Sequence, residues 1–327
     1  MQTTPKPNRA DVVEARETPA APGVSRARAR RGERGTTGQH AGSPAWLPYG
    51  LLAVPALVYA LFVLYPLIAT ARLGFYEWNG LTTPVFTGLD NFRALLGDRL
   101  FLTALTHNMV FLIFYTVVPV ALALFLTTLL AQDRPLRGLT LYRVALFVPQ
   151  VIPMVVVGVV WRWMFSPVNG LVNIALGWGG LEPRPFLGDA ATAMPAVGIV
   201  ASWVQYGFAV VLFLAGIQAI DRDLYDAVSV DGGGRWAKFR FVTLPHLRGP
   251  IVVATTVSLI AALRVFDIVF VMTRGGPANA TNVVALEIYK RAFVLRDVGE
   301  AAAAASVLML LIFGLSRFVL RFQETSA

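Results

Sequence analysis

Long runs of apolar residues dominate the chain from residue 46 onward. Each of six runs comes near or above the roughly 20 residues that a helix needs to cross the hydrocarbon core of a bilayer. We predict transmembrane helices over residues 46–70, 107–131, 141–163, 194–217, 250–273 and 300–320. Because runs of this length do not fit the alternating strands of a membrane barrel, the pattern predicts an all-α, multi-pass integral membrane protein of the cell membrane.

The third and fifth runs contain residues that disturb an apolar helix. Gln150 lies between Pro149 and Pro153, which predicts a kink whose loosened backbone can line a cavity. Arg264 and Asp267 lie three residues apart in the fifth run. A continuous helix would place these two side chains on one face, where they can form an ion pair.

Polar side chains inside a bilayer are costly and are candidates for a solute pathway. The candidates in this chain are Gln150, Gln205, Tyr206, Arg264 and Asp267. Gln205 and Tyr206, at the centre of the fourth run, suit the hydroxyl groups and ring faces of a sugar. A hydrogen bond between helices explains them equally well, and mutual neutralisation explains the Arg264 and Asp267 pair equally well.

The composition excludes most other classes of protein. Hydrophobic residues make up 56% and charged residues only 14% of the chain, whereas a soluble domain is about one quarter charged. The chain has no cysteine, and its three histidines are far apart, so we expect no disulfide, thiol chemistry or metal site. There is also no phosphate-binding Gly-x-x-x-x-Gly-Lys-Ser/Thr motif. We therefore expect neither a cofactor nor an enzyme activity, and an intramembrane enzyme has no visible machinery here.

The distribution of the basic residues predicts the orientation. The chain carries a net charge of +9, and this balance is compatible with nucleic acid or a membrane surface; the apolar runs decide for the membrane. With both termini in the cytoplasm, the cytoplasmic segments hold 18 Lys and Arg against 8 in the outer segments. Residues 1–45 lack any helical or strand period, so we predict a disordered basic cytoplasmic tail, with attraction to anionic membrane lipid as its alternative role.

The predicted cytoplasmic loop over residues 218–249 is the most structured of the loops. Asp223 is placed to cap a short helix, and the glycines at 232–234 then break it. A second amphipathic stretch follows from Arg235 to Val242, and Leu244-Pro245 ends it before the fifth run. Two short helices that display apolar side chains in water are typical of a docking surface for another protein.

This loop resembles the EAA loop of the membrane subunits of binding-protein-dependent ATP-binding-cassette (ABC) importers. The resemblance rests on Asp226, Ala227, Val228, Asp231, Gly232, Phe239, Leu244 and Pro245. The sequence departs from the family pattern with Asp for Glu at 226, Val for Ala at 228 and Gly for Ala at 233. The resemblance implies that these eight residues couple a cytoplasmic ATPase to the transmembrane helices, and it covers residues 46–322 as the permease domain.

Two further stretches, residues 161–173 and 266–293, resemble the carbohydrate branch of these permeases, which takes sugars or glycerol phosphate. The second match rests on residues that include Phe266, Asp267, Tyr289 and Phe293. The resemblance implies several partners: an ABC ATPase dimer, a second related permease in a heterodimer, an external solute-binding protein and a sugar. The alternative is an ion-coupled secondary transporter, for which Asp267 is the candidate coupling acid.

Overall fold

The computed structural model describes residues 47–130 and 139–324. The predicted basic tail over residues 1–45 lies outside this part of the chain. The chain divides into two units, residues 1–55 and residues 56–327. The first unit contributes only the opening turns of α1 (Leu47–Tyr59) to the described residues.

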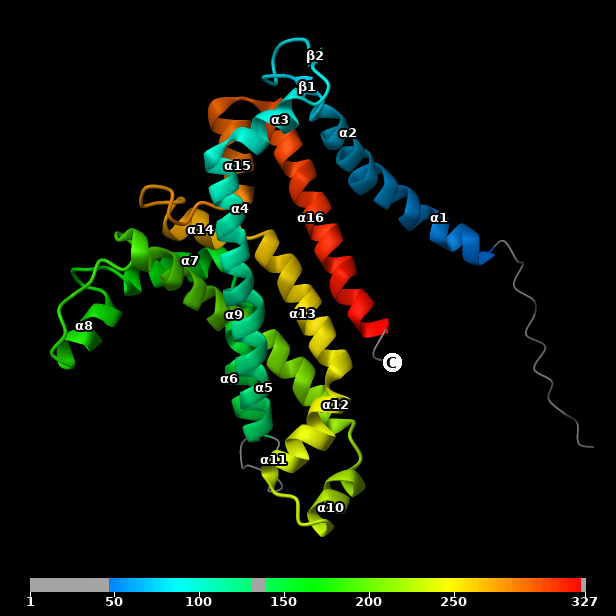
Figure 1. The fold of residues 1–327 in the computed structure, drawn as a ribbon, viewed down its shortest axis with the longest axis vertical. Helices are drawn as coiled ribbons and strands as arrows, with labels where there is room; N and C mark the ends of the chain where they lie inside the picture. The colour runs from blue at the N-terminus through cyan, green and yellow to red at the C-terminus, as the bar shows by residue number, and fades with distance from the viewer. Residues whose placement is uncertain (1–46, 131–138, 325–327) are drawn as a thin grey trace, which may run out of the picture. The chain divides into compact units, whose positions relative to one another are not determined.

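Helices make up most of the described residues (Figure 1). After α1 the elements are η1 (Ala60–Leu64), α2 (Tyr65–Leu73), β1 (Tyr76–Glu77), β2 (Val85–Phe86), α3 (Asp90–Gly97), α4 (Arg99–Leu112), η2 (Ile113–Val117), α5 (Val118–Leu130), α6 (Leu139–Val151), α7 (Met154–Met164), α8 (Leu171–Trp178), α9 (Ala190–Gln218), α10 (Arg222–Val230), α11 (Arg235–Lys238), η3 (Phe239–Thr243), α12 (Leu244–His246), α13 (Arg248–Leu263), α14 (Asp267–Met272), α15 (Val284–Tyr289), η4 (Lys290–Leu295) and α16 (Val298–Glu324), where η marks a π-helical segment. The two short strands pair antiparallel, with Tyr76 opposite Phe86. The prediction of a helical protein is confirmed.

Four helices are long and apolar enough to cross a membrane by themselves. They cover Gly50–Leu73, Arg99–Thr128, Ala190–Gln218 and Val298–Arg321. Two bent pairs, Val144–Val151 with Met154–Met164 and Arg235–His246 with Arg248–Leu263, reach the same length and hydropathy only as pairs. By length and composition, the described residues therefore contain four helices that could cross a membrane, or six such elements if each bent pair is one span.

The predicted start of the second transmembrane helix at residue 107 is wrong. The helix begins at Arg99, where the side chain of Asp98 accepts a hydrogen bond of 2.8 Å from the Leu100 amide. Asp98 is thus an N-cap, which satisfies one of the free amides at a helix start. Hydropathy alone places the start later because Thr103, Thr106 and His107 make the first turns of this helix more polar than the rest of the run.

The predicted kink in the third apolar run is confirmed and is a sharp break. Helices α6 and α7 meet at an angle of 102°. Pro153 lies at the N-cap of α7, where its missing amide costs no helical hydrogen bond. Pro149 is inside α6 and also withholds an amide from the helix. The two prolines thus separate one apolar run into two helices.

The fifth apolar run, predicted as one helix over residues 250–273, is also broken. Helix α13 ends at Leu263, and α14 begins at Asp267. Asn108 on α4 explains the end, because its amide donates hydrogen bonds to the carbonyl oxygens of Ala262 (3.3 Å) and Leu263 (3.1 Å). These carbonyls are among the last four of the helix, which always need a partner outside the helix. The expectation that Arg264 and Asp267 share a face of one helix is therefore wrong.

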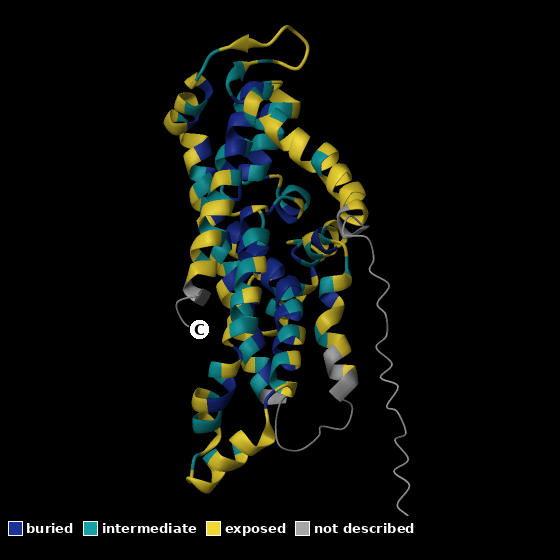
Figure 2. Ribbon diagram, turned by 90° about the vertical axis from the view of Figure 1, so that its right-hand side faces the viewer, coloured by how far each residue is buried: buried dark blue, intermediate teal, exposed yellow. Residues whose placement is uncertain are grey.

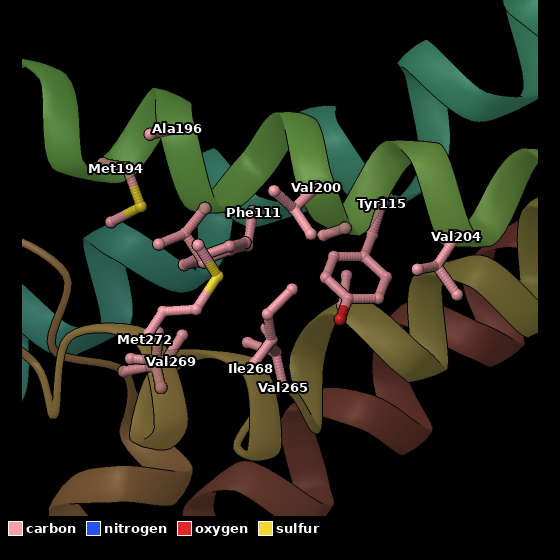
Figure 3. Packing of buried hydrophobic residues seen from close by; sticks show 14 of the residues in the cluster. Phe111, Tyr115, Met194, Ala196, Val200, Val204, Val265, Ile268, Val269 and Met272 are labelled. Carbon is pink, nitrogen blue, oxygen red and sulfur yellow. The ribbon is translucent and has the colours of Figure 1, made fainter. Parts of the chain in front are cut away.

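Helix α9 is the central element. Of its apolar window, 72% is buried, against 28% for Arg99–Thr128 and 22% for Val298–Arg321. Figure 2 shows the buried residues gathered along the interior of the bundle. One cluster joins α9 to η2, α7 and α14, and Figure 3 shows Val200 and Val204 of α9 facing Tyr115 and Ile268 there. At Gly207 a side chain is excluded, because a Cβ would lie 2.7 Å from the Leu146 carbonyl oxygen of α6.

Candidate functional site: the loop 218–249 and the polar residues of the bundle

The loop over residues 218–249 folds into two helical pieces. Helix α10 is capped by the Asp221 side chain, which accepts a 3.1 Å hydrogen bond from the Asp223 amide. The prediction that Asp223 is the cap is therefore wrong by two residues. Asp223 lies in the first turn of the helix, where the positive end of the helix dipole stabilises its negative charge. The second piece runs without interruption over Arg235–His246 and then bends by 65° into α13. Leu244 and Pro245 lie inside this piece, so they do not end it as predicted.

Two glycines shape the turn between the two pieces. Gly232 has a φ of +76°, a conformation that side chains other than glycine rarely adopt. This confirms the expectation that the first short helix turns at Gly232. At Gly233 a Cβ would lie 2.5 Å from Val228 Cγ1 and 2.8 Å from the Val228 carbonyl oxygen. A side chain at 233 would therefore meet both the side chain and the backbone of Val228, so glycine is required there.

A hydrogen bond that the sequence did not reveal joins the two pieces. The Tyr225 hydroxyl of α10 lies 3.1 Å from the Thr243 hydroxyl of η3. Thr243 is buried, so this contact ties α10 to the base of the loop. Trp236 and Phe239 form a ring pair with centroids 5.5 Å apart. The loop is therefore a defined structure and not a loose connection.

The candidate coupling residues lie on the exposed side of this structure. Asp226, Ala227, Asp231 and Gly232 are exposed, whereas Val228, Phe239, Leu244 and Pro245 are half-buried. Around them Val230, Trp236 and Phe241 are 87%, 73% and 70% exposed. Figure 2 shows this exposed tip in yellow. Large apolar side chains held in water around exposed carboxylates form a surface suited to a protein partner.

Of the candidate pathway residues, Gln205 and Tyr206 are both buried on α9. Gln205 is 6% exposed and donates a 3.0 Å hydrogen bond from Nε2 to the hydroxyl of Ser258 on α13. Tyr206 is 7% exposed and belongs to an apolar cluster with Val210, Phe213 and other residues of α5, α9 and α13. The structure thus brings Gln205 to Ser258, a polar partner that the sequence analysis missed.

Gln150, Arg264 and Asp267 lie at the two breaks of the bundle. The Oε1 atom of Gln150 is buried without a hydrogen-bond partner among the described residues. Arg264 and Asp267 are exposed on either side of the break after α13, and they form no ion pair with each other in this part of the chain. A neutral structural pair therefore does not explain these two charges.

A chain of aromatic rings lies beside the second break. Phe266 and Phe270 stack at 5.2 Å, and Tyr289 lies 5.6 Å from the first ring and 5.4 Å from the second. Phe293, at 5.3 Å from Tyr289, continues the chain and is 73% exposed. Phe266, the first of these rings, directly precedes the exposed Asp267 in the sequence.

The sequence analysis also missed a charged cluster around Arg291, which is 6% exposed. Its guanidinium pairs with Asp98 and Glu300, and its Nε lies 3.4 Å from Glu287 Oε1. Glu287 also accepts a 2.8 Å hydrogen bond from Asn282. These pairs connect the start of α4, the end of α15 and the start of α16, so the cluster fixes three helices at one place. The spacing of four residues between Glu287 and Arg291 could indicate that pair, but no spacing could reveal Asp98, which is 193 residues from Arg291.

Comparison with known proteins decides the class. Residues 123–324 match the family described as binding-protein-dependent transport system inner membrane component. The chain belongs to this family. It is 34% identical over 269 residues to the diacetylchitobiose uptake system permease protein NgcF of Streptomyces coelicolor, covering 79% of this chain and 76% of that protein. It is 32% identical over 285 residues to the sn-glycerol-3-phosphate transport system permease protein UgpA of Agrobacterium fabrum, covering 85% of this chain and 94% of that protein.

A solved structure shares the fold of the binding-protein-dependent permeases with this chain. It is a bacterial alginate ABC transporter in complex with an alginate pentasaccharide-bound periplasmic protein, with a TM-score of 0.71 and 24% sequence identity over 84% of this chain and 92% of that one. The family match and the relatives, together with the apolar helices, make the chain a multi-pass membrane subunit of an ABC importer. The family match decides between the importer and the ion-coupled transporter in favour of the importer.

Proposed function

We propose that this permease subunit forms half of the translocation pathway for a sugar or sugar-like solute. Relatives of the chain are permease proteins of uptake systems for diacetylchitobiose and for sn-glycerol-3-phosphate, both of which are rich in hydroxyl groups. The observation that supports a sugar as the solute is the set of side chains at the two breaks of the bundle. Amide, hydroxyl and carboxylate groups lie there together with a chain of aromatic rings.

The pathway lies along α9, α13 and the two breaks in this proposal. Gln205, Tyr206 and Gln150 supply uncharged hydrogen-bonding groups, and Gln150 Oε1 has no partner within the described residues. Asp267 and Arg264 supply exposed charges. Sugars are bound by hydrogen bonds to their hydroxyl groups and by contact of their rings with aromatic faces, and Tyr289 and Phe293 provide such faces.

Six membrane spans with both termini in the cytoplasm belong to the same proposal. Each bent pair then counts as one span, which brings the four single helices to six. The domains in this proposal are the tail over residues 1–45 and the permease domain over residues 46–322. The greater number of basic residues on the segments that become cytoplasmic supports the orientation.

The loop 218–249 is the docking site for the cytoplasmic ATPase in this proposal. Asp226, Ala227, Asp231 and Gly232 form its exposed contact side, and the half-buried Val228, Phe239, Leu244 and Pro245 hold that side in shape. Because the second helical piece continues by a bend into α13, a movement of the docked loop would be passed directly to that helix. ATP is hydrolysed on the separate ATPase dimer, a second related permease completes the pathway in a heterodimer, and an external binding protein delivers the solute.

Uptake into proteoliposomes that hold the complete importer tests the proposal. We expect uptake of an oligosaccharide to require enclosed ATP and the binding protein, and to persist when ionophores abolish ion gradients. We also expect Gln205→Leu to weaken uptake, since the pathway loses a hydrogen-bonding group. The matched control is Ser258→Ala on α13, which removes the same hydrogen bond between α9 and α13 but keeps the Gln205 amide. Uptake driven by an ion gradient without ATP would contradict the proposal, and equal uptake by both variants would remove Gln205 from the pathway.

A further inference from the structure

The segment between α7 and α9 turns apolar side chains away from the protein. On α8, Leu171, Ile174 and Trp178 are 61%, 43% and 84% exposed. Together with the exposed Ala175 they occupy positions i, i+3, i+4 and i+7, which lie on one stripe of a helix. In a soluble protein this apolar stripe packs against the core. Here the half-buried Val172 and the buried Asn173 face the protein instead.

Buried contacts fix the orientation of α8. The Asn173 amide donates hydrogen bonds of 3.1 Å to the carbonyl oxygens of Ser166 and Arg184, and its Oδ1 accepts one of 2.8 Å from the Arg184 amide. At Gly170, directly before the helix, a Cβ would overlap the carbonyl oxygens of Met164 and Ser166, so only glycine fits. The outward stripe is therefore a property of a firmly held helix.

The chemistry around the stripe favours a lipid environment. No Asp, Glu, Lys or Arg occurs from residue 163 to residue 181, and Val168 and Leu181 add side chains that are 82% and 55% exposed. Arg162 and Glu182 bound this segment. Tryptophan is enriched where a membrane meets water. At eight residues the helix is about 12 Å long, which is too short to cross a bilayer.

We propose that α8 is an interfacial helix that inserts the stripe of Leu171, Ile174, Ala175 and Trp178 into the lipid leaflet where α7 ends and α9 begins. A protein docking surface normally surrounds its apolar centre with a polar rim. Within this segment no charged side chain is available for such a rim. A soluble partner that leaves in each transport cycle would also return these side chains to water, whereas lipid covers them throughout.

The native absence of cysteine allows a direct test with single-cysteine variants. A nitroxide label is attached to Ile174→Cys and to Trp178→Cys in the full chain, within the complete importer in lipid nanodiscs. Spin relaxation then measures collisions with oxygen, which concentrates in lipid, and with a nickel chelate, which stays in water. We expect both labels to show a several-fold higher ratio of oxygen to nickel collisions than a label at Val230→Cys, which is 87% exposed on the loop 218–249.

A label at Val172→Cys, on the inward face of the same helix, provides the second control and should collide little with either reagent. Nickel collisions at 174 and 178 as frequent as those at 230 would show that the stripe lies in water. Low collision rates with both reagents at 174 and 178 would show that a protein chain covers the stripe. Either result would overturn the proposal, and neither depends on which solute the importer carries.

Discussion

Single buried polar side chains connect segments that are distant in the sequence. Asn108, which is fully buried, donates to the carbonyl oxygens of Ala262 and Leu263 and accepts a 2.9 Å hydrogen bond from the Val284 amide. One side chain therefore holds the end of α13 and the start of α15. Buried backbone groups need such partners, because a group left without one costs about 1–3 kcal/mol.

We predict that Asn108→Leu lowers the stability of the chain by about 1–3 kcal/mol for each backbone group left without a partner. The measurement is thermal unfolding of the purified chain in detergent. The matched control is Asn79→Leu, because Asn79 likewise takes part in three hydrogen bonds, all of 2.9 Å and all accepted by its Oδ1, but is exposed, so that water can replace it. Equal losses in the two variants would show that burial of Asn108 is not the cause.

Residues with a local role can be recognised in the sequence more easily than residues whose partners are distant in the chain. The turn at Gly232 follows from three consecutive glycines and is visible locally. The role of Asn108 depends on partners 154 to 176 residues away. A hydropathy pattern shows Asn108 only as a polar residue in an apolar run and does not show its partners. The same reason hides the Arg291 cluster and the Gln205 contact with Ser258. Candidate residues could be chosen from the sequence, but their partners could not.

At the scale of elements, helix ends follow caps and prolines, which hydropathy does not register. The helices predicted over 194–217 and 300–320 agree with α9 and α16 within a few residues, because polar or turn-forming residues bound those runs. Pro149 and Pro153 predict the break after α6. The break after α13 has no such signal, since no proline or glycine marks it and its cause is Asn108 on another helix.

Close contact between α6 and α9 leads to a second prediction. Gly207→Ala should destabilise the chain by about 1–3 kcal/mol, because its Cβ would lie 2.7 Å from the backbone oxygen of Leu146 and the two helices must separate. Gly314→Ala on α16 is the control, since nothing lies within 4 Å of its Cβ and alanine favours a helix. Detergent-solubilised chains should unfold at a lower temperature only with the first change. Unfolding of the Gly207 variant at or above the temperature of the control would argue against tight packing there.

At the scale of the whole molecule, the proposed orientation in the membrane would place the loop 218–249 on the side of the proposed ATPase. Figure 1 shows, within the second unit, α10 and α11 at the end opposite to β1 and β2. The excess of basic residues favours the cytoplasm for the end with α10 and α11. The hairpin with β1 and β2 would then face the binding protein.

Cysteine labelling in intact cells tests this orientation. A membrane-impermeant maleimide should label Leu81→Cys, whose native side chain is 80% exposed in the hairpin loop, and should leave Arg235→Cys unlabelled until the cells are opened. The native chain supplies the blank, because it contains no cysteine. Labelling of Arg235→Cys from outside intact cells would contradict the proposed topology.

The most direct test of the central claim is ATP-driven uptake by Gly232→Val and by Gly88→Val in the reconstituted importer. Both glycines have positive φ angles, +76° and +64°, and a Cβ added at either would meet no other atom within 4 Å, so valine causes the same kind of backbone strain at each. Strain of about 1–3 kcal/mol at the docking surface corresponds to a loss of coupling of roughly fivefold to 150-fold. We predict that only Gly232→Val loses uptake and ATPase co-purification, while both variants insert and the binding protein still binds solute. Uptake near the native rate with Gly232→Val, or an equal loss with Gly88→Val, would contradict the role of the loop 218–249 in driving transport.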